Sequence, residues 1–194
     1  MKELFLITTG MLVLTVGVVP WALSYNRWQA NSQRWVSEFH LQALELQRPW
    51  VKVAPPGSHF TVMMPAAPRG EVKTNDTPMG LATTNLYIYQ TEHGWYGATW
   101  TVYPPKMKID INVELNATRD NFVKAVNGTL LEENSVFASG TVGKQFIAES
   151  PNATLTSRIF VMGNSTYQIA VAFPKNEDHK KDVERFLSSF ALVK

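Results

Sequence analysis

The sequence contains no cysteine, which excludes disulfide bonds, thiolate metal sites and a cysteine nucleophile. Charged residues are also scarce, at 18% of the chain, and the net charge of +2 is too small to indicate binding to nucleic acid. The densest basic group, His179-Lys180-Lys181, is surrounded by acidic residues and forms no run that would follow phosphates. We therefore expect no nucleic-acid partner.

Recognisable catalytic and metal-binding motifs are absent as well. The four histidines are scattered, none forms the i, i+4 pair of a helical zinc site, and no G-x-S-x-G motif occurs. His93 is predicted to be a solvated turn residue. Asp110-Ile-Asn-Val-Glu114 looks like the start of a calcium loop, but Leu115 stands where that loop needs Gly, so a helix N-terminus capped by Asp110 or Asn112 is favoured. We expect no enzyme activity, no cofactor and no metal.

Arg158 interrupts an otherwise apolar strand. Leu155, Ile159 and Val161 satisfy the buried face of that strand, so we predict that Arg158 faces solvent. Binding of an anion by Arg158 remains the alternative.

The segment from Leu4 to Leu23 carries no charged residue. Twenty helical residues at ~1.5 Å each span ~30 Å, which is the hydrocarbon thickness of a bilayer. We predict a retained membrane anchor over residues 1–24, with the following domain in a periplasm, a lumen or the extracellular space. The alternative is a cleaved signal peptide, because Ala22-Leu-Ser24 resembles a cleavage site.

Residues 25–50 are predicted to form a juxtamembrane helix and linker, because Tyr25 to Arg48 contains neither Pro nor Gly and Pro49 follows. Its large aromatic residues recur at helical spacing, and others lie at the expected bilayer boundary. We predict that these aromatic residues contact a partner protein or the membrane surface: Trp21, Tyr25, Trp28, Trp35 and Phe39. The alternative is a helix that folds back onto its own domain.

Residues 51–194 are predicted to form one α+β domain with a largely antiparallel sheet. Helices are expected near 113–126 and 177–190, and a polar loop is expected between the first strand, which begins at Phe60, and the strand from Thr83. Gly163-Asn164 is a strong hairpin signal because both residues tolerate positive φ. In the last strand, bulky residues alternate with small ones, which predicts one thick face and one face for close helix packing.

The last helix has the clearest pattern. Its apolar residues follow i, i+3, i+4, i+7 spacing at Val183, Phe186, Leu187 and Phe190, and Asn176 is the expected N-cap.

Seven short stretches in this domain carry a family resemblance: Phe60-Thr-Val-Met-Met-Pro65, Thr77-Pro-Met-Gly80, Arg119-Asp-Asn-Phe-Val123, Gly143-Lys-Gln-Phe146, Arg158-Ile-Phe-Val-Met-Gly-Asn164, Tyr167-Gln-Ile-Ala-Val171 and Arg185-Phe-Leu-Ser-Ser-Phe190. With them, the region from Phe60 to Leu192 resembles the bacterial and cyanobacterial PsbP-like domains, which share the fold of the Mog-type Ran-binding proteins. The resemblance implies an α/β/α sandwich that docks onto a larger complex, including photosynthetic ones. It implies no catalytic residues.

The function expected from these observations is a non-catalytic accessory or assembly subunit of a membrane protein complex. Two alternatives belong to other classes. A membrane-tethered binding or sensor domain for a small ligand or anion would be favoured by a deep pocket near Arg158. A hydrolase of unfamiliar design would be favoured by a buried His93 paired with a carboxylate.

Overall fold

The computed structural model describes residues 49–193. The predicted anchor over residues 1–24 and nearly all of the juxtamembrane segment 25–50 lie outside the described residues. The same holds for every predicted contact residue, namely Trp21, Tyr25, Trp28, Trp35 and Phe39. Between residues 49 and 193, no helix has the length and apolar character needed to cross a membrane.

The described part contains ten strands and two helices. In chain order these are β1 (Val51–Val53), β2 (Phe60–Met64), β3 (Arg69–Thr77), β4 (Gly80–Gln90), β5 (Trp95–Val102), α3 (Ile111–Ala125), β6 (Thr129–Ala138), β7 (Thr141–Glu149), β8 (Ala153–Met162), β9 (Ser165–Pro174), α4 (Lys180–Ser188) and β10 (Ala191–Leu192).

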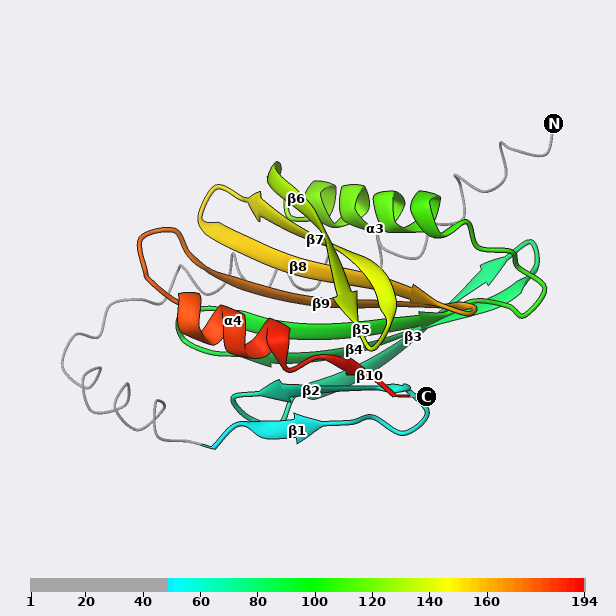
Figure 1. The fold of residues 1–194 in the computed structure, drawn as a ribbon, viewed down its shortest axis with the longest axis horizontal. Helices are drawn as coiled ribbons and strands as arrows, with labels where there is room; N and C mark the ends of the chain where they lie inside the picture. Colours follow the sequence, from blue (N-terminus) through cyan, green and yellow to red (C-terminus); the bar gives the residue numbers. More distant parts are fainter. Residues whose placement is uncertain (1–48, 194) are drawn as a thin grey trace.

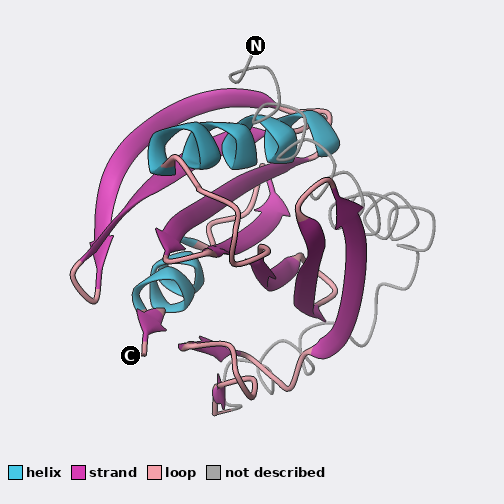
Figure 2. Ribbon diagram, turned by 90° about the vertical axis from the view of Figure 1, so that its right-hand side faces the viewer, coloured by secondary structure: helices cyan, strands magenta, loops and turns pink. Residues whose placement is uncertain are grey.

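Seven strands form one sheet in the order β3-β4-β5-β9-β8-β7-β6, and every neighbouring pair is antiparallel. Helix α3 lies on one face of this sheet, while α4 and the small sheet β1-β2-β10 lie on the other (Figure 1). The view turned by 90° shows that the large sheet is strongly curved (Figure 2). The expected antiparallel α+β fold is thereby confirmed.

The alternation of side chains along β9 produces two cores, one on each face of the large sheet. Tyr167, Ile169, Val171 and Phe173 belong to the core beneath α4, and the small residues Ala170 and Ala172 belong to the core beneath α3. This is the division of bulky and small faces that the sequence pattern predicts. The Gly163-Asn164 hairpin is also confirmed, since Met162 pairs with Ser165 and Gly163 has a φ of 62°.

Helix α4 buries Phe186 and Leu187 as predicted, but it spans Lys180–Ser188 rather than 177–190, so the buried Phe190 lies just after it. The expected N-cap at Asn176 is therefore wrong. Strand β9 continues to Pro174, and the chain then turns, with the Glu177 amide donating to the Pro174 carbonyl at 3.3 Å. The residues that were expected in the first turn of the helix therefore lie in this connecting turn.

Strand β3 is the main element that the sequence reading missed, because its residues were predicted to lie in a polar loop. Its sequence, RGEVKTNDT, is polar on both faces, and all but a few of its residues are exposed. It forms an edge of the large sheet and pairs with β4 over its whole length. Pairing with the hydrogen-bonding edge of β4 therefore determines that these residues form a strand. The sequence contains no alternating apolar pattern that would predict it.

Candidate ligand-binding cleft

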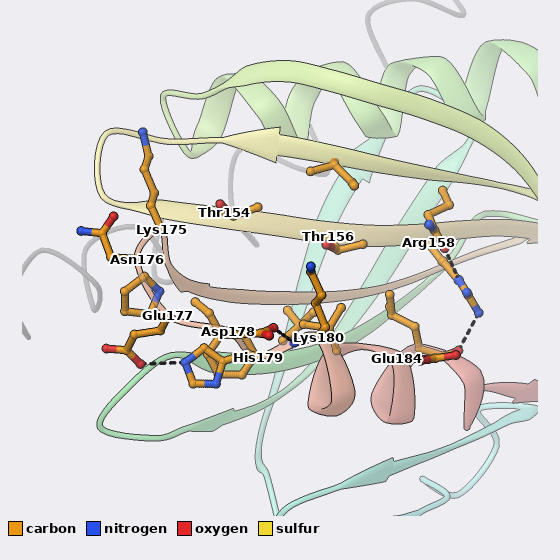
Figure 3. A pocket seen from close by; sticks show the side chains of 17 residues that line it. Thr154, Thr156, Arg158, Lys175, Asn176, Glu177, Asp178, His179, Lys180 and Glu184 are labelled. Atoms are coloured by element: carbon orange, nitrogen blue, oxygen red, sulfur yellow. Dashed lines mark hydrogen bonds and ion pairs between the residues drawn. The ribbon is translucent and has the colours of Figure 1, made fainter.

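A cleft of about 710 Å³ lies between α4 and the large sheet. Its floor is formed by residues of β7, β8 and β9 on the face opposite α3. Its walls are α4 and the turn before it, residues 174–179 (Figure 3). Ile147, Val171, Phe173, Val183 and Leu187 supply apolar surface. The cleft is thus a mostly aliphatic groove into which a few polar side chains project.

Strand β8 supplies the polar part of the floor. Because its side chains alternate, Thr154, Thr156 and Arg158 all face the cleft, while Leu155 and Ile159 are buried on the α3 side. The predicted alternation is confirmed. The prediction that Arg158 faces open solvent is wrong, because α4 covers that face and leaves the side chain half-buried.

Two hydrogen bonds hold the Arg158 guanidinium at one end of the cleft. Its Nε donates to Gln145 Oε1 at 2.7 Å, and Nη1 donates to the Leu187 carbonyl at 2.9 Å. Burial lowers the pKa of Arg158. None of the ion pairs formed among residues 49–193 includes Arg158. Its positive charge therefore lacks a counter-ion in the described part of the protein.

Charges of both signs surround the rest of the cleft. Lys180 lines it from the start of α4, and Lys175 forms an ion pair with Glu149. Three acidic residues also line the cleft: Glu177, Asp178 and Glu184. The Asp178 carboxylate accepts a hydrogen bond from the Lys180 amide at 3.1 Å. These carboxylates would oppose a ligand with several negative charges.

Two histidines meet at the turn that closes one end of the cleft. Glu177 Oε2 lies 2.7 Å from His179 Nε2 and 3.6 Å from His93 Nδ1. The His179 ring stacks on Phe173, with the ring centroids 3.9 Å apart. The His93 side chain is 34% exposed. His93 therefore has the carboxylate partner named for the hydrolase alternative, but it lacks the burial.

The Asp110–Glu114 segment begins α3, as predicted. Asp110 Oδ1 accepts a hydrogen bond from the Val113 amide at 3.1 Å, which is the expected N-cap. Glu114 instead points inward, and its Oε1 accepts hydrogen bonds from three buried hydroxyls: Tyr103 at 2.7 Å, Thr166 at 2.9 Å and Thr118 at 3.3 Å. Within residues 49–193, no group of three or more His, Asp or Glu side chains is arranged to hold a metal ion.

The Tyr103 hydroxyl predicts a loss of stability at alkaline pH. Burial, followed by the charge of Glu114, raises the pKa of Tyr103 above its ordinary value of 10.0. Both states hold the proton below pH ~10, but above it only the unfolded chain releases the proton, so stability falls as pH rises, by at most ~1.4 kcal/mol per pH unit for this group. Urea unfolding between pH 9 and 11 should show a shallower fall for Tyr103→Phe, and equal slopes would contradict this assignment.

A second surface feature is an exposed apolar pair near the tip of the β6-β7 hairpin. Phe137 and Val142 lie directly opposite each other on β6 and β7 and are 75% and 50% exposed. The hairpin tip between them lies beside β10, where Ser139 Oγ accepts a hydrogen bond from the Leu192 amide at 3.1 Å. We call Phe137 and Val142 the docking patch.

Of the residues that stand out in the sequence, Arg158 and His93 both lie near the cleft. Thr154, Thr156, Lys180 and the docking patch were not predicted. The i, i+2, i+4 spacing of Thr154, Thr156 and Arg158 was the available signal, since residues at that spacing share one face of a strand. Nothing in the sequence alone showed that α4 would cross this face.

No protein-family model matches the sequence, and no curated protein matches it. Among solved structures, the chain is similar to cyanobacterial PsbP (CyanoP) from Synechocystis sp. PCC 6803. The TM-score is 0.52, the sequence identity is 8%, and the match covers 75% of this chain and 93% of that one. A protein from Bacteroides thetaiotaomicron VPI-5482 matches with a TM-score of 0.35 and 15% identity, over 74% of this chain and 48% of that one.

The described part of the chain is thus an α+β domain built from an antiparallel sheet and two helices. The likeness to CyanoP shows that this fold is PsbP-like. At 8% identity, the likeness concerns the fold alone.

Proposed function

We propose that this protein is a non-catalytic accessory or assembly subunit of a membrane protein complex. The docking patch is the observation that carries the proposal, because Phe137 is 75% exposed and its cross-strand neighbour Val142 is 50% exposed. Burying a side chain of this size against a partner is worth ~1.5–3 kcal/mol, and contiguous exposed apolar residues mark interaction sites. The likeness to cyanobacterial PsbP supports a photosynthetic complex as the first partner to test.

The proposed membrane association rests on the sequence. An anchor over residues 1–24 would tether the domain, and the aromatic residues Trp28, Trp35 and Phe39 would contact the partner or the membrane surface. The domain would then lie in a periplasm, a lumen or the extracellular space.

Replacing both side chains of the docking patch, in the double variant Phe137→Ser and Val142→Thr, should release the partner. We expect recovery of co-purifying subunits from mild detergent to fall by about tenfold or more, as the lost burial is worth ~1.4 kcal/mol or more. The measurement is quantitative mass spectrometry of proteins that co-purify with the tagged full-length chain.

The matched control is Val72→Thr on β3, since Val72 is 61% exposed at the opposite edge of the large sheet. This variant should retain the partner at the wild-type level. Recovery of the wild-type protein as a lone monomer, or equal loss in the control, would count against the proposal.

A second candidate function is binding of a small ligand or anion by the same domain. The cleft beside Arg158 is the specific observation that favours it. This role is compatible with docking, because the cleft and the docking patch lie on opposite faces of the large sheet.

A further inference from the structure

The cleft contains a row of hydrogen-bonding groups along one strand. Thr154, Thr156 and Arg158 occupy alternate positions of β8, so at ~3.3 Å per residue their Cα atoms span ~13 Å of the floor. Two threonine side chains and one guanidinium therefore lie in a row along the groove. A ligand lying along β8 would meet the half-buried guanidinium at one end, and Lys175 and Lys180 line the rest of the cleft.

The Arg158 guanidinium is fixed in place, and part of its hydrogen-bonding capacity is unused. A guanidinium has five N–H donors, and the bonds to Gln145 and to the Leu187 carbonyl use two of them. Those two bonds lock the plane of the group before any ligand arrives. The remaining N–H groups form the kind of donor pair that binds a carboxylate through two parallel hydrogen bonds.

Arg158 is a half-buried cation, and an anionic ligand would supply the counter-ion that the described residues do not. A charged group removed from water is destabilised unless it is paired, and no ion pair within residues 49–193 includes Arg158. The acidic residues that line the cleft have other contacts or are exposed. Glu177 contacts two histidines, Asp178 accepts from the Lys180 amide, and Glu184 is exposed.

The walls restrict which anion fits. Phe173, Val183 and Leu187 give the groove apolar surface that an inorganic ion would leave uncovered. A volume of about 710 Å³ lies within the range of sites that enclose an organic molecule. Three lining carboxylates, those of Glu177, Asp178 and Glu184, offset the charges of the two lining lysines. Arg158 is therefore left to balance one negative charge on the ligand. A single carboxylate attached to an apolar body satisfies all three conditions.

We propose that the cleft between α4 and β8 binds an amphiphilic monocarboxylate, with its carboxylate on Arg158 and its apolar body against Phe173 and Val183. Thr154 and Thr156 provide hydrogen bonds for polar groups along the body. This inference rests on the second candidate function and does not depend on the docking patch.

The test uses the full-length protein in lipid nanodiscs and 4-phenylbutyrate as the probe, with binding measured by calorimetry and empty nanodiscs subtracted. The neutral analogue 4-phenylbutanamide, acetate and inorganic phosphate are the matched compounds. We expect 4-phenylbutyrate to bind with an affinity at least about tenfold higher than each of the three. No binding of 4-phenylbutyrate at millimolar concentration, or equal affinity for the amide, would overturn the proposal. Tighter binding of phosphate would instead assign the site to an inorganic ion.

Two variants locate the binding. Arg158→Gln should weaken 4-phenylbutyrate by about tenfold or more, whereas Arg69→Gln, which changes an exposed arginine on β3, should not. Val183→Trp fills the groove without removing Arg158, so it should also abolish binding, and it keeps the test decisive if Arg158→Gln fails to fold. Unchanged affinity in a folded Arg158→Gln or Val183→Trp protein would refute the site. Partner capture is not measured, so a failure here leaves the docking proposal standing.

Discussion

Replacing Glu114 with Ala is expected to lower the free energy of unfolding by ~3 kcal/mol. One oxygen of this buried carboxylate accepts hydrogen bonds from Tyr103, Thr118 and Thr166. Leaving a buried donor without an acceptor costs ~1–3 kcal/mol, and the Tyr103 hydroxyl has the least freedom to turn elsewhere. The same residue joins α3 to β9 and to the end of β5, so its loss loosens the contact between helix and sheet.

Urea unfolding of the full-length protein, followed by tryptophan fluorescence, measures this effect. Glu114→Gln keeps the size and one acceptor oxygen and should cost clearly less than Glu114→Ala. Glu132→Ala removes an exposed carboxylate and should change stability by less than ~0.5 kcal/mol. A loss below ~1 kcal/mol for Glu114→Ala would show that the hydroxyls find other acceptors and that the cluster is not stabilising.

The sequence predicts the helix that contains Glu114 but not the inward position of its side chain. The helix and its Asp110 cap were predictable, because capping depends on residues within one turn. Two of the three partners of Glu114, Tyr103 and Thr166, are 11 and 52 residues away in sequence. Only the packing of α3 on the sheet brings these hydroxyls together, and no local pattern records it.

The same distinction separates the sheet strands that were predicted from the one that was missed. Strand β9 has a strong bulky-small alternation because both its faces are buried, so its pattern could be read directly. Strand β3 lies at an exposed edge and has almost no apolar residue, so its strand structure depends on the pairing edge of β4. Turn-forming residues such as Gly70 and Pro78 made a loop the natural prediction.

The sequence predicts which side chains of β8 share a face, but not the element that covers that face to form the cleft. Alternation along β8 places Arg158 on the face away from Leu155, and this part of the prediction holds. The identity of the element that covers that face depends on how the chain returns after β9. The turn at residues 175–178 directs α4 across the sheet and converts a solvent-facing row into the floor of a groove.

Replacing Phe186 with Ala is expected to have the largest effect on stability, a loss of ~3–5 kcal/mol. Phe186 is fully buried in the core beneath α4, and its ring meets that of Tyr96 edge-on with centroids 5.2 Å apart. Truncation removes this contact and leaves a cavity that the surrounding β-strands cannot fill by moving. Because α4 also forms a wall of the cleft, the variant should bind 4-phenylbutyrate more weakly even where it remains folded.

Denaturant unfolding of the full-length protein tests this prediction, with calorimetric binding as the second readout. Lys181→Ala lies on the exposed side of the same helix and should stay within ~0.5 kcal/mol of wild type. Phe186→Leu keeps much of the apolar volume, so its loss should fall between the two. A Phe186→Ala loss no larger than ~1 kcal/mol would mean that α4 is not anchored through this residue. The cleft wall would then have to be held mainly at the helix end, where Ser189 Oγ accepts from the Met63 amide at 2.8 Å.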